Sequence, residues 1–141
     1  MTYLLDTDIF TLAHHNQYGL RERLDRVTAP DRVALPMNTW VEVMCGRLDM
    51  VRKASSSTEL LRALEWLHHS MQFLAAFPII PFDDEAAKEY ERLRSNKSLK
   101  KVDRGDLIAA SIALAHQATL VTRNTRHFAA IPGLQVTDWS K

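Results

Sequence analysis

The sequence has little cysteine, no long apolar run and no secretion signal, the features that would indicate a secreted or membrane protein. It has one cysteine, Cys45, among 141 residues, which excludes an intramolecular disulfide framework. The longest apolar stretch, residues 73–82, is too short to span a bilayer and is interrupted by Pro78 and Pro81. No cationic segment followed by an apolar stretch opens the chain, as a secretion signal would. We therefore expect a cytoplasmic protein that does not act at a membrane.

A net charge of either sign is also nearly absent. The formal net charge is +1, so no overall field demands a nucleic-acid partner. The charges are unevenly spread, however, because residues 92–104 carry six basic side chains and a single acid. This window is either a solvated helix end and loop or a rim that contacts phosphate groups beside an acidic site.

Repeats, low-complexity tracts and Gly/Ser linkers are missing as well, so we expect a single domain over residues 1–141. Short apolar runs instead alternate with amphipathic segments. The runs predict strands at residues 3–5, 33–35, 79–80 and 120–121, with a last one around residue 136. Strands that alternate with helices predict an α/β fold of three layers, in which helices cover both faces of a central, mostly parallel sheet.

Polar residues in front of the amphipathic segments predict where the helices begin. Short side chains with an oxygen atom can accept hydrogen bonds from the unpaired N–H groups of a first helical turn. The expected capping or first residues are Thr7 or Asp8, Asn38 or Thr39, Asp83, and Asp103 or Arg104.

A longer helix is predicted after residue 58. Its apolar side chains step by four, three, four and three residues, so they form one continuous stripe. We interpret this stripe as the core-facing side of the helix, with a groove for a partner as the alternative. The stripe consists of Leu60, Leu64, Leu67, Met71 and Leu74.

Four polar side chains at the ends of apolar elements carry the functional signal. Asp6 and Asn124 each follow a predicted strand, whereas Glu42 and Asp106 lie in the first turns of predicted helices. Ligands of parallel sheets gather beyond the carboxyl ends of the strands, and this topology allows all four residues to meet there. Burying a carboxylate is costly unless it is paired or holds a cation. The pattern therefore suggests a site that binds a hard cation through oxygen atoms.

Three of these residues also have simpler interpretations. Asp6 could merely cap a helix, and Asp106 could stabilise a helix N-terminus that opens at Asp103. Asn124 could be an ordinary turn residue. Glu42 is harder to explain in this way, because an acid in an apolar stretch needs a partner.

The chain also resembles a known family along nearly its whole length. The matching segments are Leu4-Leu5-Asp6-Thr7-Asp8, Glu42, Gly105-Asp106-Leu107-Ile108-Ala109-Ala110, residues 120–128, and Pro132-Gly133-Leu134 followed by Asp138-Trp139. In this order and at these separations, they are similar to those of PIN-domain ribonucleases of the VapC toxin type. The resemblance implies a PIN-like fold and an endoribonuclease that is the toxin of a type II toxin–antitoxin pair.

The same resemblance implies the cofactor, the site residues and the partners. Asp6, Glu42 and Asp106 match the three carboxylates that hold Mg²⁺ or Mn²⁺, and Asn124 falls where many members have a fourth Asp. A neutral amide there weakens the hold on a second metal ion. Asp103 is the competing candidate for the third acid. The partners implied are an RNA substrate, a small cognate antitoxin whose C-terminal segment covers the active site, and a second copy of the chain in a homodimer.

Other polar residues are expected around the acids. Thr7, Asp8, Thr122 and Asp103 are candidates for orienting the metal ligands or a water molecule. A metal-activated water needs no histidine as general base. We interpret the histidine pairs 14–15 and 68–69 as surface residues. The residues expected to contact RNA phosphates are Arg123, Arg126, Lys97, Lys100, Lys101 and Arg104.

Two other functions fit parts of the pattern. Asp6-Thr7-Asp8 at a strand end resembles the nucleophile motif of haloacid-dehalogenase-like phosphatases, but Phe10 stands where that motif has Thr or Val, and Glu42 would have no role. A catalytically weak PIN-like module that binds RNA or protein is the second alternative, and the neutral Asn124 is its best support.

Overall fold

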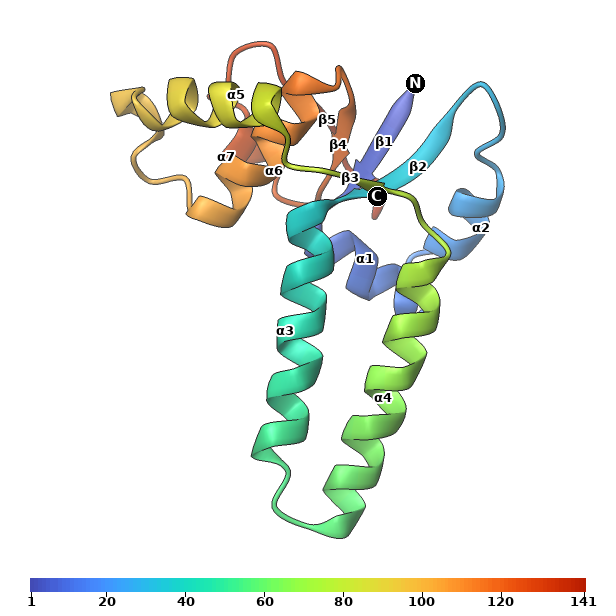
Figure 1. The fold of residues 1–141 in the computed structure, drawn as a ribbon. Coiled ribbons are helices and arrows are strands. Elements are labelled where there is room, and N and C mark those ends of the chain that lie inside the picture. The colour runs from blue at the N-terminus through green and yellow to red at the C-terminus, as the bar shows by residue number, and fades with distance from the viewer.

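The computed structural model describes residues 1–141 as a five-stranded sheet with helices packed against both faces (Figure 1). Every pair of neighbouring strands is parallel, and the order across the sheet is β3-β2-β1-β4-β5. The strands are β1 (Thr2–Leu5), β2 (Arg32–Pro36), β3 (Ile79–Ile80), β4 (Thr119–Val121) and β5 (Gln135–Thr137). The predicted α/β architecture is confirmed, with a sheet that is entirely rather than mostly parallel.

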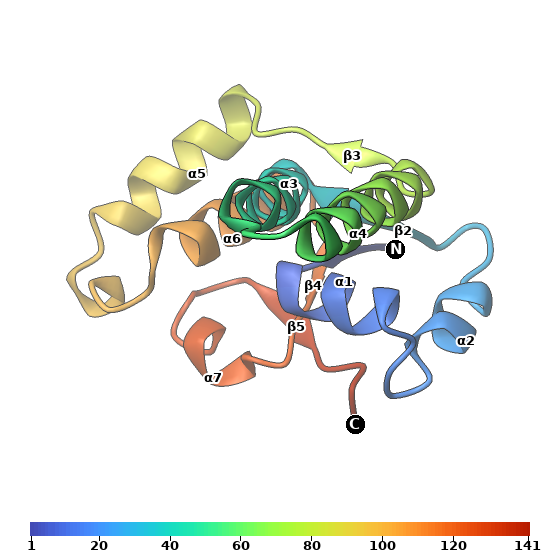
Figure 2. The same ribbon diagram turned by 90° about the horizontal axis from the view of Figure 1, so that it is seen from below.

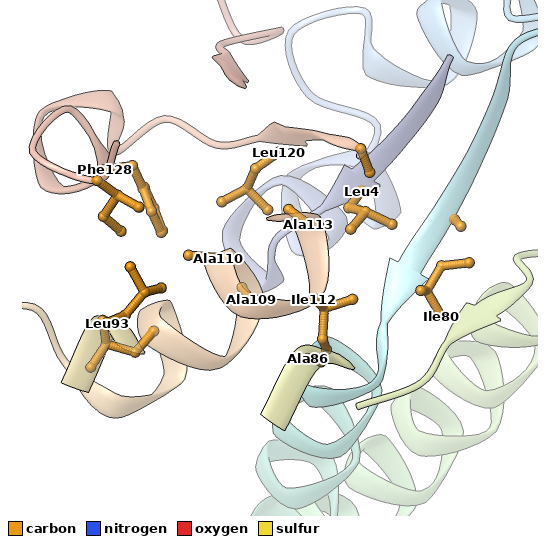
Figure 3. Close-up of a cluster of buried hydrophobic side chains, with 14 of the residues drawn as sticks. Leu4, Ile80, Ala86, Leu93, Ala109, Ala110, Ile112, Ala113, Leu120 and Phe128 are labelled. Atoms are coloured by element: carbon orange, nitrogen blue, oxygen red, sulfur yellow. The ribbon is translucent and has the colours of Figure 1, made fainter. Parts of the chain in front are cut away.

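The central strands are buried on both faces, which explains why they read as short continuous apolar runs. Successive side chains of a strand point to opposite faces. Leu4 therefore enters one core cluster, together with Ile112 and Phe128, and Leu5 enters the other, together with Phe10. Figure 3 shows the first of these clusters, in which the small side chains of one helix pack against the sheet.

Seven α-helices and one 3₁₀ turn connect the strands. Most helix starts that the sequence predicts are found within one or two residues. The helices are α1 (Thr7–His14), α2 (Leu20–Asp25), α3 (Met37–Lys53), α4 (Ser57–Ala75), α5 (Asp84–Arg94), α6 (Arg104–Ala115) and α7 (Thr125–Phe128), with the 3₁₀ turn η1 at Lys97–Leu99.

The capping residues differ from the prediction at two helices. Asp6, not Thr7 or Asp8, caps α1, because its side chain accepts a hydrogen bond from the backbone N–H of Ile9. Helix α3 begins directly after β2 without any side-chain cap, so neither Asn38 nor Thr39 has that role. The buried Thr39 hydroxyl instead donates to the carbonyl of Leu5 at 3.0 Å, which ties α3 to β1.

Asp83 and Asp103 are the N-caps of α5 and α6, as predicted. Each accepts a hydrogen bond from the backbone N–H three residues further on, the usual geometry of a capping carboxylate. At the start of α6 this hydrogen bond joins the Asp103 side chain to the backbone of Asp106.

Helices α3 and α4 form a hairpin that projects away from the sheet (Figure 1). The interpretation of the α4 stripe as core holds only at its end: Leu74 is buried and Leu67 half-buried, but Leu60, Leu64 and Met71 remain 41%, 46% and 51% exposed. The buried positions of α4 are Ala63, Ser70 and Leu74. A hairpin outside the layered body packs one helix face against its partner and leaves the remaining apolar side chains in solvent.

The interpretation of His14 as a surface residue is also wrong. His14 is buried between α1 and α4, where its ring stacks on Trp66 at a centroid distance of 4.2 Å and lies 5.1 Å from the Phe73 ring. Burial, followed by the positive charges of Arg47 and Arg21, lowers the pKa of His14 to about 4. The adjacent His15 is exposed, since neighbours on a helix point in different directions.

None of the helices is both long and apolar enough to cross a membrane.

Candidate active site

A polar pocket lies at the carboxyl edge of the sheet, lined by residues of α1, α3 and α6 and of the segments around α7; Figure 2 shows the arrangement of these helices from below. Its volume is about 250 Å³, and alanine is its only hydrophobic lining residue. All four residues that the sequence singled out line it. The full lining is Asp6, Thr7, Asp8, Asn38, Glu42, Asp103, Gly105, Asp106, Ala109, Asn124 and His127.

Asp6 is held at the junction of β1, β4 and α1. Its backbone N–H donates to the carbonyl of Val121 at 3.1 Å, and its carboxylate accepts from the N–H of Ile9 at 2.9 Å. Burial raises the pKa of Asp6 to about 6, although hydrogen bonds from the Thr122 hydroxyl and the Ile9 N–H favour the ionised form; the charges of Asp8 and Asp106 raise the pKa further. The cap and the pocket carboxylate are therefore the same side chain.

Glu42 reaches the pocket from the exposed side of α3. Its neighbours Trp40 and Val41 are themselves exposed, so the argument that Glu42 is an acid in an apolar environment was wrong, although the residue does lie at the site. The Thr7 hydroxyl donates a hydrogen bond to its carboxylate. A Cβ atom at Gly105 would stand 2.6 Å from Glu42 Oε1, so only glycine at this position leaves room for the carboxylate.

Asp106 lies in the first turn of α6, and its backbone N–H donates to Asp103 Oδ1 at 3.0 Å. Burial raises the pKa of Asp106, and the negative charges of Asp103 and Glu42 add to the effect. A hydrogen bond from His127, whose Nδ1 is 3.5 Å from Asp106 Oδ2, acts in the opposite direction. Asp103 thus has the capping role that was predicted for it and is also one of the five acids that line the pocket.

Two polar side chains of the pocket lining were not among the predicted site residues. His127 lies within 3.2 Å of the Asn124 amide, and the spacing of three residues from Asn124 is the signal that could have revealed it. Asn38 was considered only as a cap, but it is four residues before Glu42 on the same face of α3. Its amide donates to the carbonyl of Gly105 at 3.1 Å and joins the starts of α3 and α6.

The predicted accompanying residues divide into two groups. Thr7, Asp8 and Asp103 line the pocket, and Thr122 is buried beneath it with its hydroxyl accepting from the Asn124 N–H at 3.0 Å. The structure brings none of the predicted RNA-contacting residues into the pocket lining, although all of them are exposed. These residues are Arg123, Arg126, Lys97, Lys100, Lys101 and Arg104.

The donor set suits a hard divalent cation. Carboxylate, amide and hydroxyl oxygens dominate the lining, and these are the ligands that Mg²⁺ and Mn²⁺ prefer. The charge of Asp106 helps to raise the pKa of Asp6, and the charges of Asp103 and Glu42 help to raise the pKa of Asp106. A cation among these carboxylates would relieve the repulsion. The acids share one pocket without standing at the spacing of a completed three-ligand cluster.

Comparison with known proteins assigns this arrangement to a family. Residues 3–134 match the PIN domain. The chain is 29% identical over 146 aligned residues to the Ribonuclease VapC2 of Rickettsia felis, and the match covers all of both chains. It is 30% identical over 132 residues to the Ribonuclease VapC5 of Mycobacterium tuberculosis, with 92% of this chain and 87% of that one covered.

A solved structure extends the likeness to the fold. The crystal structure of VapBC2 from Rickettsia felis, bound to a DNA fragment from its promoter, contains a chain that matches with a TM-score of 0.76 and 27% identity over 99% of both chains. The chain thus belongs to the PIN-domain family, to which its parallel sheet and acid-lined pocket conform. Within that family it is one of the VapC-type ribonuclease toxins of type II toxin–antitoxin systems.

Proposed function

We propose that this protein is a Mg²⁺- or Mn²⁺-dependent endoribonuclease that hydrolyses RNA phosphodiester bonds in the cytoplasm. The observation that carries the proposal is the convergence of Asp6, Glu42 and Asp106, from three separate elements, on one pocket. Carboxylates repel a phosphodiester unless a cation stands between them. An acid-lined pocket in a ribonuclease family therefore supports a metal-mediated reaction.

The chain's own residues would divide the work as follows. Asp6, Glu42 and Asp106 would hold the cation, and the Thr122 and Thr7 hydroxyls would keep the first two carboxylates oriented through the hydrogen bonds already described. The bound ion would supply charge neutralisation and a water molecule of lowered pKa. Asn124 adds an oxygen donor without charge, which favours one tightly held ion over two.

The partners are proposed from the surface and from the relatives. The relatives are ribonucleases, so their substrate is RNA. The Rickettsia felis structure contains VapBC2 bound to a DNA fragment from the promoter. We propose that this chain likewise pairs with a small antitoxin and forms a homodimer. The exposed apolar side chains of the α3–α4 hairpin support a protein partner, because a contiguous apolar surface is unfavourable in water.

An RNA cleavage assay with matched acid-to-amide variants tests the proposal. Asp6→Asn and Asp106→Asn should each lower the Mn²⁺-dependent cleavage rate at least about 100-fold, because loss of one carboxylate ligand removes charge that the cation needs. The control is Asp84→Asn, which changes an exposed acid on α5 outside the pocket and should cleave as the unmodified protein does. Full activity of both pocket variants would show that the site has been assigned wrongly.

A binding module that does not cleave RNA is the second candidate. The neutral Asn124, which stands in the pocket where a further carboxylate would strengthen metal binding, favours it. The same assay separates the two functions if metal binding is followed by calorimetry. RNA binding without cleavage at saturating Mn²⁺ supports the module, whereas metal-dependent product formation supports the enzyme.

A further inference from the structure

A second hollow lies apart from the acidic pocket, between α2, the start of β1 and the segment after β5. Its volume is about 550 Å³, and its rim includes the exposed ring of Tyr18 and the guanidinium groups of Arg23 and Arg26. Trp139 forms part of the wall, with Arg23 over its ring at 5.0 Å and Tyr3 packed against it at 5.0 Å. None of the proposed catalytic residues lines this hollow.

Tyr18 is held on the surface in a conformation that its side chain does not favour. Its φ angle is +57°, in the left-handed region, and it lies between Asn16 at +55° and Gly19 at +63°. A bulky residue with positive φ is a strained outlier. The ring is nevertheless 56% exposed, so burial does not account for its position, and an exposed aromatic face is available to a ligand.

Arg123 connects this ring with the acidic pocket. Its guanidinium lies 5.3 Å from the centre of the Tyr18 ring, and the next residue in the chain, Asn124, lines the pocket. The hollow and the pocket are therefore neighbouring parts of one surface, joined at the end of β4. An extended chain that leaves the pocket over Arg123 meets Tyr18 first.

The cations along this path have no hydrogen-bond or ion-pair partner in the protein, although Arg23 and Arg123 have aromatic rings as neighbours. Arg23, Arg26 and Arg123 make neither side-chain hydrogen bonds nor ion pairs. Of the two acids on the rim, Asp31 is already paired with the N-terminal amine at 3.0 Å, which leaves Glu22. Asp138 is also near Arg123, since this arginine contributes to lowering the pKa of Asp138. Three unpaired cations beside an exposed aromatic ring suit a ligand that is both anionic and flat.

We propose that Tyr18 and Arg123 form a nucleotide-binding subsite for single-stranded RNA that flanks the cleavage position. A base stacks on the free face of the Tyr18 ring, Arg123 contacts the phosphate nearest the acidic pocket, and Arg23 and Arg26 contact phosphates further along the strand. Aromatic stacking accepts any base, and phosphate contacts carry no sequence. The subsite therefore adds affinity and direction to the path of the RNA. It rests on the proposed function, because it names where that site's substrate continues.

Binding is measured on protein that carries Asp6→Asn, so that RNA is not consumed. The probe is a fluorescein-labelled, unstructured RNA pool of random sequence, followed by anisotropy. Tyr18→Asn removes the ring yet suits a left-handed backbone, and it should weaken binding roughly 5- to 150-fold, as loss of one base stack does. Tyr18→Trp keeps an aromatic face and should retain binding. Thermal denaturation of each variant separates a loss of RNA contact from a loss of folding.

The role of Arg123 is tested through the salt dependence of the same titration. Arg123→Ala should reduce the slope of log K against log salt by about 0.7, the value for one phosphate contact on a single strand. Lys53→Ala is the matched control, because Lys53 is an exposed cation already paired with Asp49 at 2.7 Å at the end of α3. Its slope should not change.

Covalent mapping locates the contact. RNA that contains 5-iodouridine should cross-link to Tyr18 under ultraviolet light, as identified by mass spectrometry of the peptides. Unchanged affinity of Tyr18→Asn together with no cross-link at Tyr18 would overturn the subsite, even if the unmodified protein cleaves RNA. Conversely, a subsite that binds RNA in a protein without any metal-dependent cleavage would leave the subsite standing and overturn the proposed enzyme.

Discussion

At the scale of single residues, Asp6 combines two roles that the sequence presents as alternatives. The same carboxylate caps α1 and faces the acidic pocket, and the two roles are compatible because one oxygen accepts the Ile9 N–H. The cap orients the side chain, and burial then makes its charge costly. A helix N-terminus is a suitable place for such an acid, since the helix dipole favours a negative charge there.

The burial of Asp6 predicts a gain in stability when its charge is removed. With a pKa of about 6 in the folded protein and 3.8 as its ordinary value, Asp6 ionises in the unfolded chain first as the pH rises, so folding loses stability between about pH 4 and pH 6. Asp6→Asn stays neutral and can still cap α1. Urea unfolding of metal-free protein at pH 7 should show Asp6→Asn more stable by roughly 1–3 kcal/mol.

A measurement with metal present makes this prediction specific. Mn²⁺ should raise the melting temperature of the unmodified protein, because a ligand that binds only the folded state stabilises it. The same concentration should leave Asp6→Asn nearly unchanged. If Asp6→Asn were less stable than the unmodified protein at pH 7, the carboxylate would be stabilising and its proposed high pKa would be wrong.

Gly105 predicts a second effect at the residue scale, one that acts mainly on Glu42, although an added Cβ atom would also stand 3.3 Å from Asp103 Oδ1. Gly105→Ala would place a Cβ atom 2.6 Å from Glu42 Oε1, and the flexible Glu42 side chain must turn away. The helix itself tolerates alanine. We therefore expect a melting temperature within a few degrees of the unmodified protein and a cleavage rate lowered at least about ten-fold by the misplaced ligand.

Gly46→Ala is the matched control for this substitution. It lies on α3, and a Cβ atom there would meet nothing within 4 Å. Normal cleavage by both variants would mean that the position of the Glu42 carboxylate does not matter for the reaction.

At the scale of secondary-structure elements, the sequence predicts those parts of the fold that obey a local rule. All five strands, the parallel sheet and the caps Asp83 and Asp103 follow from apolar runs and short polar side chains. The convergence of Asp6 and Asn124 follows from the rule that parallel strands end at one edge. These residues needed no tertiary information.

The errors fall where the environment of an element depends on distant neighbours. The period of the α4 stripe is helical, but the period does not reveal that the hairpin leaves the body of the molecule, so Leu64 was assigned to a core it does not join. Glu42 was assigned to an apolar environment for the same reason, whereas its neighbours Trp40 and Val41 are exposed. His14 was assigned to the surface because nothing in its own helix reveals that Trp66 covers it. In each case the helix itself was predicted correctly, and the error concerns whether another part of the protein covers the side chain.

The buried His14 predicts a pH dependence that belongs to the packing of α1 against α4. Its pKa of about 4 in the folded protein lies below its ordinary value of 6.5. As the pH falls between these values, the unfolded chain binds a proton that the folded protein does not, so the stability decreases. His14→Phe keeps an aromatic ring between Trp66 and Phe73 and removes the titration.

Urea unfolding from pH 7 to pH 4 measures this effect. The unmodified protein should lose up to about 1.4 kcal/mol per pH unit more than His14→Phe, the limit for one proton. His15→Phe, the exposed neighbour, should keep the slope of the unmodified protein. Parallel slopes for the unmodified protein and His14→Phe would show that the buried ring does not resist protonation.

At the scale of the whole molecule, the exposed apolar side chains are unusual in their grouping rather than their number. An apolar hollow of about 510 Å³ lies between the start of α3 and helices α5 and α6, and Met37, Val41 and Phe82 line it. These three side chains are also exposed by 36%, 42% and 41%. Scattered apolar residues are normal on a surface, but a hollow rimmed by them marks an interaction site.

This surface predicts where the proposed homodimer forms. In a two-fold dimer the same surface patch of each subunit contacts its copy on the other subunit. One substitution therefore introduces two charges into the interface, and burying them opposes association. Light scattering coupled to size exclusion at about 10 μM should give twice the chain mass of 16.1 kDa. Val41→Lys or Phe82→Lys should reduce this to a single chain, whereas Leu61→Lys, at an exposed position on α4, should remain dimeric. A monomer in the unmodified protein would exclude the homodimer, and a Leu61→Lys monomer beside dimeric Val41→Lys would move the interface to the hairpin.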